Sequence, residues 1–212
     1  WDMTFWFCCF GFYGKYFSFF LKTYKSNFVF VDVGANAGLY SLIAGHNHYC
    51  VHSHCFEPDP TTLLFLTRNI ELNNAKNILV HHYAIADERG QKHVSVNQYH
   101  SGSLSLDAPS PTDEERDTIL IECVNASDLS DIISSTEQEL IIKIDVEGYE
   151  RVVIGELLKC EFAQHIEHVY FEAGGSRENI ETSIDLLTKA GFVTLYHSNV
   201  FGHKNIHMVR SR

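Results

Sequence analysis

A short apolar strand that runs directly into a glycine loop is the feature that most constrains this fold. Phe28–Val33 reads as a buried strand, the loop carries Gly34 and Gly38, and a helical run begins at Leu39. Gly34 allows a sharp turn where a side chain would collide with a ligand, and Gly38 lets the start of the helix pack near the strand. We expect Asn36 to cap the helix. The unit predicts a ligand site at the carboxyl end of the strand.

The rest of the chain alternates between short β-branched runs and helical periodicity. This alternation predicts an α/β domain with a largely parallel sheet. The expected strands are Phe28–Val33, Cys50–Phe56, Ile78–Ile85, Leu140–Val146, His168–Glu172, Phe192–Tyr196 and Asn205–Val209. Helices are expected after Gly38, Asp59, Glu150 and Ser176, with Asp59 as an N-cap.

One stretch breaks this alternation. Lys92–Leu106 and Ile119–Val124 read as two further strands, which form an inserted hairpin-like segment around residues 107–117. The connecting loop would be either a solvated surface loop or a mobile cover over a site.

Charge and cysteine content exclude some classes of protein. The 212 residues carry a formal net charge of -11, which repels a phosphate backbone, so we expect no nucleic acid partner. The 45% hydrophobic composition is that of an ordinary folded protein. Six cysteines, two of them adjacent at Cys8 and Cys9, do not form the spaced pattern of a disulfide scaffold. A mostly reduced protein is expected.

The glycine spacing distinguishes between nucleotide cofactors. A dinucleotide site with the pattern G-x-G-x-x-G would place its second glycine at position 36, where this chain has Asn36. Asp32 stands two residues before Gly34, and this spacing suits a cofactor with a cationic end and no phosphate, such as S-adenosylmethionine. Glu57, at the end of the second strand, can accept the ribose hydroxyls of either kind of cofactor.

With these motifs the chain resembles the FkbM-type S-adenosylmethionine-dependent methyltransferases. Four segments carry the resemblance, in this order: Phe30–Gly38, Phe56–Pro60 with its helix through Asn69 and Asn73, Ala84–Asp87, and Lys143–Glu150. Together they span roughly residues 27–209. The resemblance implies a Rossmann-like class I methyltransferase fold with a seven-stranded sheet and helices on both faces.

The resemblance also implies cofactor-binding residues. Those expected at the methionine half are Asp32, Gly34, Asn36 and Gly38; Glu57 would bind the ribose; Ala86 and Asp87 would lie near the adenine. The chain departs from the usual pattern in the polar strand Cys50–Cys55 and in Phe171–Gly175, where a histidine is expected soon after the acid. These departures bear on the substrate pocket.

Methyl transfer to an alcohol needs a base that accepts the hydroxyl proton. Asp145, at the end of the fourth strand of the sheet, is the first candidate, and Glu147 in the following loop is the second. Glu172 is a weaker third candidate. Lys143 shares a strand face with Asp145, so the two could instead form a structural ion pair.

Metal binding is the alternative for two groups of residues. Asp145 and Glu147 resemble carboxylates that bind magnesium in some sugar O-methyltransferases, but two acids alone are weak evidence for a metal. The histidines and cysteines of residues 46–55 suggest zinc, yet this segment must also serve as a strand of the sheet. We predict no metal site and interpret residues 46–55 as polar strand residues.

The first twenty residues are rich in aromatic side chains and contain only two charges, Asp2 and Lys15. We expect this segment either to contact a membrane, to dock on the domain, or to be a truncated remnant, because the chain opens at Trp1. We therefore divide the chain into an aromatic segment at residues 1–26 and an FkbM-like domain at residues 27–212. A cytoplasmic location is the default expectation, with membrane association as the alternative.

The sequence thus predicts an S-adenosylmethionine-dependent methyltransferase that methylates a hydroxyl of a small metabolite or sugar. Oxygen as the acceptor follows from the resemblance. One rival is a non-catalytic binding module of the same fold, held at a membrane or partner surface. The other is an NAD-dependent oxidoreductase, which Asn36 disfavours.

Overall fold

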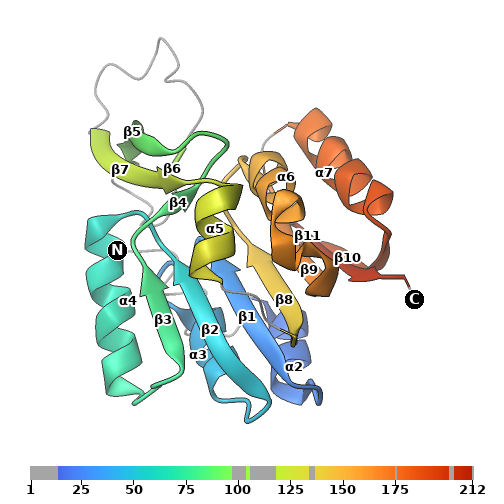
Figure 1. Cartoon of the computed structure of the whole chain (residues 1–212), viewed down its shortest axis with the longest axis horizontal. Coiled ribbons are helices and arrows are strands. Elements are labelled where there is room, and N and C mark those ends of the chain that lie inside the picture. Colours follow the sequence, from blue (N-terminus) through green and yellow to red (C-terminus); the bar gives the residue numbers. More distant parts are fainter. Residues whose placement is uncertain are drawn as a thin grey trace.

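A seven-stranded sheet organises the protein (Figure 1). The computed structural model describes residues 14–96, 104–105, 118–133, 137–174, 176–200 and 203–211. The strands of this sheet are β1 (Phe28–Val33), β2 (Cys50–Phe56), β3 (Ile78–His81), β8 (Glu139–Ile144), β9 (Ile166–Ala173), β10 (Phe192–Val200) and β11 (His203–Arg210). They lie in the order β10-β11-β9-β8-β1-β2-β3, and β11 runs antiparallel to both of its neighbours. The predicted α/β class and mostly parallel sheet are confirmed.

The strand order reverses between β1 and β8, which pair in parallel. The chain builds the sheet outward through β2 and β3, and then returns to the other side of β1. Ligand sites of open α/β sheets lie outside the carboxyl ends of the strands at such a switch point. The site is therefore expected where Asp32, Gly34 and Asp145 leave their strands.

Helices cover both faces of the sheet. On one face are α2 (Lys15–Thr23), α3 (Leu39–Gly45) and α4 (Pro60–Leu72); on the other are α5 (Ala126–Ile132), α6 (Glu150–Lys159) and α7 (Arg177–Lys189). A 3₁₀ helix, Glu161–His165, leads into β9. The alternation of β1 explains the two layers, because Phe28 and Phe30 join the cluster under α2 and α3 while Val29 and Val31 join the larger core on the other side.

The helices predicted after Gly38, Asp59, Glu150 and Ser176 are all present. Asp59 caps α4 by accepting a hydrogen bond from the N–H of Thr61, as expected. The expectation that Asn36 caps α3 is wrong. Gly38 occupies the N-cap position in a left-handed conformation, and the Asn36 side chain accepts the N–H of Ala37 inside the loop instead.

The strand predicted over Ile78–Ile85 is in fact two strands in two sheets. β3 ends at His81, and β4 (Ala84–Ile85) joins a second sheet in the order β4-β7-β5-β6. The other strands of that sheet are β5 (Gly90–Val96), β6 (Leu104–Ser105) and β7 (Thr118–Val124). The antiparallel pair β5 and β7 confirms the inserted hairpin-like segment. Its predicted loop, residues 107–117, lies outside the described residues.

Helix α2 was not predicted from the sequence, yet it is firmly packed. Phe17 and Leu21 are fully buried, and the ring of Phe17 stacks on Tyr170 at 4.1 Å between centroids. The Asn47 amide donates to the carbonyls of Leu21 and Tyr24 and so closes the helix end. From Gly14 onward the aromatic segment is therefore docked on the sheet. Residues 1–13 lie outside the described part of the chain.

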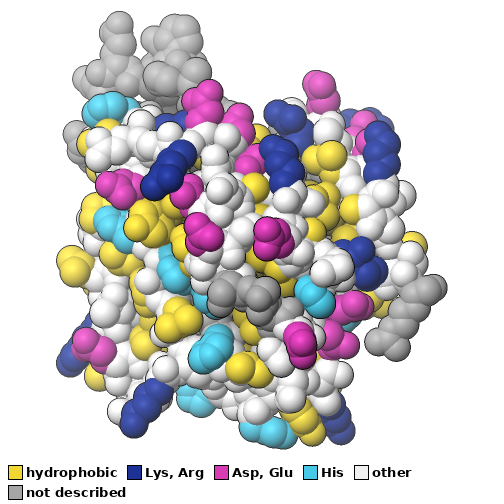
Figure 2. Space-filling view, viewed as in Figure 1, with side chains coloured by type: hydrophobic (Ala, Val, Ile, Leu, Met, Phe, Trp, Pro, Cys, Tyr) yellow, Lys and Arg dark blue, Asp and Glu magenta, His cyan; other side chains and the backbone are white. Residues whose placement is uncertain are grey.

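Two surface properties complete the description. Within the described residues, no helix combines the length and the apolar character needed to cross a bilayer. On the face drawn in Figure 2, Lys and Arg side chains are scattered among Asp and Glu and gather into no continuous basic patch. A phosphate backbone would meet mixed charge there.

Candidate functional site

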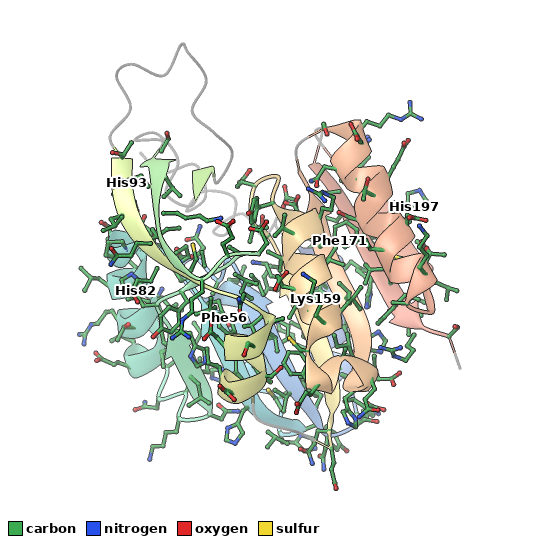
Figure 3. All side chains as sticks on the ribbon, turned by 45° about the horizontal axis from the view of Figure 1, so that its top comes forward. Phe56, His82, His93, Lys159, Phe171 and His197 are labelled. Carbon is green, nitrogen blue, oxygen red and sulfur yellow. The ribbon has the colours of Figure 1, made fainter. Side chains whose placement is uncertain are left out.

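A cavity opens at the carboxyl ends of the central strands, beneath the second sheet. It has an empty volume of about 490 Å³ and is lined by Val33, Gly34, Phe56, Glu57, Pro58, Tyr83, Ala84, Ile85, Ile121, Asp145 and Val146. Figure 3 turns this end of the sheet toward the viewer and labels Phe56, the last residue of β2. Three of the predicted site residues, Gly34, Glu57 and Asp145, meet in the lining.

The glycine loop forms the floor between β1 and α3. Gly34 has a φ of 72°, and a Cβ atom there would collide with the carbonyl oxygen of Asp145. Gly38 has a φ of 87°, and a Cβ atom would come 2.5 Å from Cδ1 of Leu66. The left-handed conformation favours glycine at both positions. The close neighbours differ from those predicted, because Gly34 faces the backbone of Asp145 instead of a ligand and Gly38 faces Leu66 of α4 instead of the strand. The N–H groups of Gly34 and Ala35 both donate to the carbonyl of Phe56, which ties the loop to β2.

Glu57 fixes the shape of that loop from below. Only 4% of the residue is exposed, and its two carboxylate oxygens accept hydrogen bonds from the N–H of Asn36 at 2.8 Å and of Asp59 at 2.9 Å. Burial raises the pKa of Glu57 to about 7, although these two hydrogen bonds oppose the shift. A carboxylate oxygen can accept more than one hydrogen bond, so Glu57 can still receive donors from a molecule in the cavity.

A buried ion network lies beside the loop. Lys143 Nζ is 2.6 Å from the carbonyl oxygen of Gly34, 3.2 Å from Asp32 Oδ1 and 3.7 Å from Asp145 Oδ2. Asp32 is fully buried and also accepts a hydrogen bond from Ser41 Oγ at 2.6 Å. Asp32 thus lies beneath the cavity wall, with protein partners at both oxygens. The ion pair between Lys143 and Asp145 that the strand spacing suggested is present.

The loop after β8 carries the second candidate base. Glu147 is exposed, has a φ of 52° and is not part of the cavity lining. The next residues are held from behind, because Glu150 accepts the N–H of Gly148 and the Asn179 amide donates to the carbonyls of Gly148 and Gly174. Asn179 also donates to Glu150 at 2.9 Å. Burial raises the pKa of Glu150. Glu150 therefore holds the loop after β8 in place from the first turn of α6.

The two residues expected near the adenine lie at the edge of the second sheet. Ala86 is buried, and its N–H donates to the carbonyl of Val124. Asp87 is exposed, accepts a hydrogen bond from the Tyr149 hydroxyl at 3.1 Å and lies 3.5 Å from Lys92 Nζ. The preceding residues, Ala84 and Ile85, line the cavity directly. Tyr149 was missed by the sequence reading, which singled out its acidic neighbours.

The histidines and cysteines form no metal site in the part of the chain that the structure describes, where no group of three or more potential ligands converges. His54 Nδ1 lies 3.0 Å from His81 Nε2, and burial followed by the neighbouring histidines lowers the pKa of His54 to about 4. Cys50, Cys55, Cys123 and Cys160 are buried free thiols.

Comparisons with known proteins agree with this geometry. The family model for the methyltransferase FkbM domain matches residues 32–194. "Methyltransferase 1" of Beauveria bassiana (strain ARSEF 2860) is 24% identical over 177 residues, which cover 76% of this chain and 71% of that protein. The FkbM methyltransferase structure from Methylobacillus flagellatus KT has a TM-score of 0.58 and 17% identity, over 86% of this chain and 43% of that one.

A third likeness is to a protein with a cofactor product bound. The structure of M. capricolum TrmK in complex with S-adenosylhomocysteine has a TM-score of 0.55 and 10% identity, over 94% of this chain and 70% of that one. At such identities the solved structures show the fold alone. That fold is the class I methyltransferase fold.

The family match goes further than the fold: this chain belongs to the FkbM methyltransferase family. Its cofactor is S-adenosylmethionine, and the NAD-dependent alternative is set aside. The residues present fit that cofactor. The carboxylates of Asp32 and Asp145 lie close to Lys143 beside the cavity, and Glu57 in the lining adds a third acid. Acidic side chains in this position complement a positively charged sulfonium.

Proposed function

We propose that this methyltransferase transfers the methyl group to a hydroxyl oxygen of a small metabolite or sugar, with Asp145 as the base. The observation that carries the proposal is the position of Asp145, which lines the cavity at the switch point together with Gly34 and Glu57. No other acid among the predicted base candidates lines it. Asp145 is therefore the carboxylate best placed to meet an acceptor inside the cavity.

Each cofactor-binding residue then has a defined task. Glu57 would accept the ribose hydroxyls through the lone pairs that its two backbone partners leave over. Gly34 would give the ligand close access to the loop backbone. Asn36 and Gly38 would act by holding that loop in its left-handed turns. Asp32 would contribute its charge from beneath the wall, and Ala86 and Asp87 would hold the edge of the cavity near Ala84 and Ile85.

S-adenosylmethionine supplies an electrophilic methyl group, so the chain itself needs to align the acceptor and take up its proton. Asp145 would accept that proton as the oxygen attacks. Glu147 is exposed in the same loop and outside the cavity lining. It is the second candidate base and would contact the acceptor from outside the cavity. Tyr40, Tyr170 and Glu172 lie near Asp145 on the same side of the sheet and would shield it from bulk water.

The test compares Asp145→Asn with the native protein. The amide keeps the size of the side chain but cannot take a proton, so we expect turnover to fall by about 10²- to 10⁴-fold. The affinity for S-adenosylmethionine should weaken far less, through the loss of one negative charge beside the sulfonium. Turnover is measured with methyl-labelled S-adenosylmethionine and a panel of sugars and small hydroxy metabolites, and the new bond is identified by NMR. Glu147→Gln is the matched control and should lose much less.

Three results would overturn parts of this proposal. Full turnover in Asp145→Asn would remove Asp145 as the base. A product methylated on nitrogen or carbon would remove the oxygen acceptor. Tight cofactor binding without transfer to any member of the panel or to proteins in a cell extract would favour the non-catalytic binding module.

A further inference from the structure

Lys143 occupies an unusual position for a lysine, since it is almost fully buried in the middle of the sheet. It lies in β8, opposite Asp32 of β1 on one side and Tyr170 of β9 on the other. Buried lysines are rare and need partners for their charge. Lys143 has such partners in β1, in the loop after β1 and in the loop after β8.

The ammonium group has three donors, and three acceptors surround it. They come from three separate segments: the Asp32 carboxylate in β1, the Gly34 carbonyl in the cofactor loop, and the Asp145 carboxylate after β8. The ring of Tyr40 in α3 lies 5.7 Å from Nζ and closes the remaining side. Nζ donates a hydrogen bond to the Gly34 carbonyl, and both carboxylates lie within ion-pair distance of it.

Burial lowers the pKa of Lys143, but the charges of Asp32 and Asp145 outweigh that effect and leave the pKa above its usual value. The lysine is therefore a fixed cation under all physiological conditions. A lysine that keeps its proton cannot itself exchange one with a methyl acceptor. Its effect on the reaction must pass through the groups that it touches.

We propose that Lys143 is a positioning residue that holds the cofactor loop and the base in fixed positions relative to each other. The hydrogen bond to Gly34 fixes the loop that the cofactor contacts, and the contact with Asp145 fixes the direction of the carboxylate on the other side of the cavity. This inference rests on the proposed role of Asp145. A purely structural lysine would need only Asp32, with which it already forms the shorter of its two ion pairs.

The test removes Lys143 without leaving a buried unpaired charge. Lys143→Met alone would leave the buried Asp32 carboxylate without its ion-pair partner. The informative comparison is therefore between Asp32→Asn and the double variant Asp32→Asn/Lys143→Met. These two proteins differ only in the lysine. Lys189→Met, which removes an exposed lysine paired with Asp185 on α7, is the matched control for loss of one positive charge.

Two measurements report on the two contacts and need no acceptor. Calorimetric titration with S-adenosylmethionine reports on the loop. We expect the double variant to bind about tenfold more weakly than Asp32→Asn, because the loss of the hydrogen bond to Gly34 outweighs the added negative charge. NMR of protein labelled at the aspartate carboxyl carbons, with Asp145 assigned through Asp145→Asn, reports on the base, and we expect the carboxyl chemical shift of Asp145 to change when the lysine beside it is removed.

The outcomes separate this inference from the proposed function. Unchanged affinity and an unchanged carboxyl chemical shift of Asp145 in a folded double variant would show that Lys143 is only structural and would overturn the inference. Full turnover in Asp145→Asn would instead overturn the base, and the affinity measurement would still decide the role at the loop. If the double variant does not fold, Lys143→Arg keeps the charge with a different geometry. Native values of both readouts in Lys143→Arg would likewise overturn the inference.

Discussion

Two regions on the same face of the sheet bury polar groups in opposite ways. At the switch point, Asp32, Lys143 and Asp145 form an ion network. A second region lies under α2, where aromatic rings pack around two histidines. We call it the aromatic cluster. Its members are Tyr16, Phe17, Phe20, His168, Tyr170 and His207. The two regions are neighbours, because Lys143 pairs with Tyr170 and Tyr170 pairs with His207 across the strands.

The aromatic cluster avoids charge altogether. His207 is fully buried, with Nδ1 3.0 Å from the Tyr16 hydroxyl and Nε2 3.1 Å from His168 Nδ1. Burial, and then the neighbouring His168, lower the pKa of His207 to about 3. In the aromatic cluster, where α2 packs on the sheet, the buried polar groups thus form hydrogen bonds with one another. Beside the cavity, by contrast, the network keeps charged groups at the cost of desolvation. We therefore expect the ion network to matter for the reaction and the aromatic cluster to matter for the docking of α2.

The largest expected effect is that of Lys143→Met. Removing one partner of a buried ion pair leaves an uncompensated charge on Asp32, and such changes cost about 3–5 kcal/mol of the free energy of unfolding. Urea unfolding followed by circular dichroism measures the loss. The double variant Asp32→Asn/Lys143→Met should recover most of it. A loss below about 1 kcal/mol in the single variant would mean that the charge of Asp32 is not truly buried, and the contrast between the two regions would fail.

The second effect concerns Glu57, the other acid beside the cavity. With a pKa of about 7, Glu57 becomes protonated as the pH falls below neutrality and then offers the ribose a poorer acceptor. Below the pKa the competent fraction falls about tenfold per pH unit. Between pH 7 and pH 6 the ionised fraction of Glu57 falls from about one half to about one tenth, so we expect the Kd for S-adenosylmethionine, measured by calorimetry, to rise about fivefold.

Glu57→Gln is the control for that titration, because it is neutral at every pH. Its affinity should be weaker than that of the native protein and nearly constant between pH 6 and pH 8. A native affinity that does not change over this range would contradict the prediction. A pH dependence that persists in Glu57→Gln would assign it to another group, such as the cofactor itself.

His207→Phe tests the aromatic cluster and should have a smaller effect. A phenyl ring suits the apolar surroundings, and the half-buried Tyr16 and His168 lose one hydrogen bond each, so we expect a loss of about 1 kcal/mol at neutral pH. A loss as large as that of Lys143→Met would show that the cluster depends on its polar groups as strongly as the network does.

The same variant has a pH signature with a definite sign. Since the pKa of His207 is lowered in the folded protein, the unfolded chain binds the proton first, and stability falls as the pH drops from about 6.5 toward 3. His207→Phe should lose less stability than the native protein between pH 7 and pH 4.5. Part of the slope should remain, because the pKa of His54 is lowered in the same direction.

These regions also show which parts of the molecule the sequence could predict. The turn at Gly34 and the cap of α4 at Asp59 follow local rules of spacing and residue type, and they were found. Glu57 was singled out as a ribose acceptor, but its hydrogen bonds to the N–H groups of Asn36 and Asp59, which anchor the loop, were not predicted. The break between β3 and β4 was missed, because Ala84 leaves the main sheet to pair with Cys123 in β7, far along the chain. No local signal at Ala84 reveals that partner.

Contacts between distant side chains were missed for the same reason. Asn179 clamps the loop at Gly148 from α7, and Tyr149 reaches Asp87 at the second sheet. Each joins segments that only the folded chain brings together. The position of Asp32 beneath the cavity wall likewise depends on Ser41 and Lys143. Helix α2 was also not predicted from the sequence. Its segment is rich in aromatic residues throughout, so the positions that are buried, Phe17 and Leu21, could not be distinguished from the exposed ones.

The smallest expected effect concerns the outer side of α2, where a membrane contact through residues 1–20 stays a prediction. Residues 3–31 contain lysines but no acid, in a chain with a net charge of -11. Phe19 is 69% exposed on α2, at helical spacing from Lys15 and Lys22. An exposed aromatic ring flanked by lysines suits the surface of an anionic membrane. Phe65 on α4 is 63% exposed and offers a matched ring beside the Arg68–Glu71 ion pair.

We expect the full chain to sediment with vesicles that contain phosphatidylserine and less with neutral ones. Phe19→Ser should weaken this binding by a factor of about five, which corresponds to about 1 kcal/mol for partial insertion of one ring. Phe65→Ser should leave it unchanged. Equal losses in the two variants would show that exposed rings bind vesicles wherever they stand. No binding by the native chain would leave α2 as a purely internal support, built like the rest of the aromatic cluster to hold the sheet.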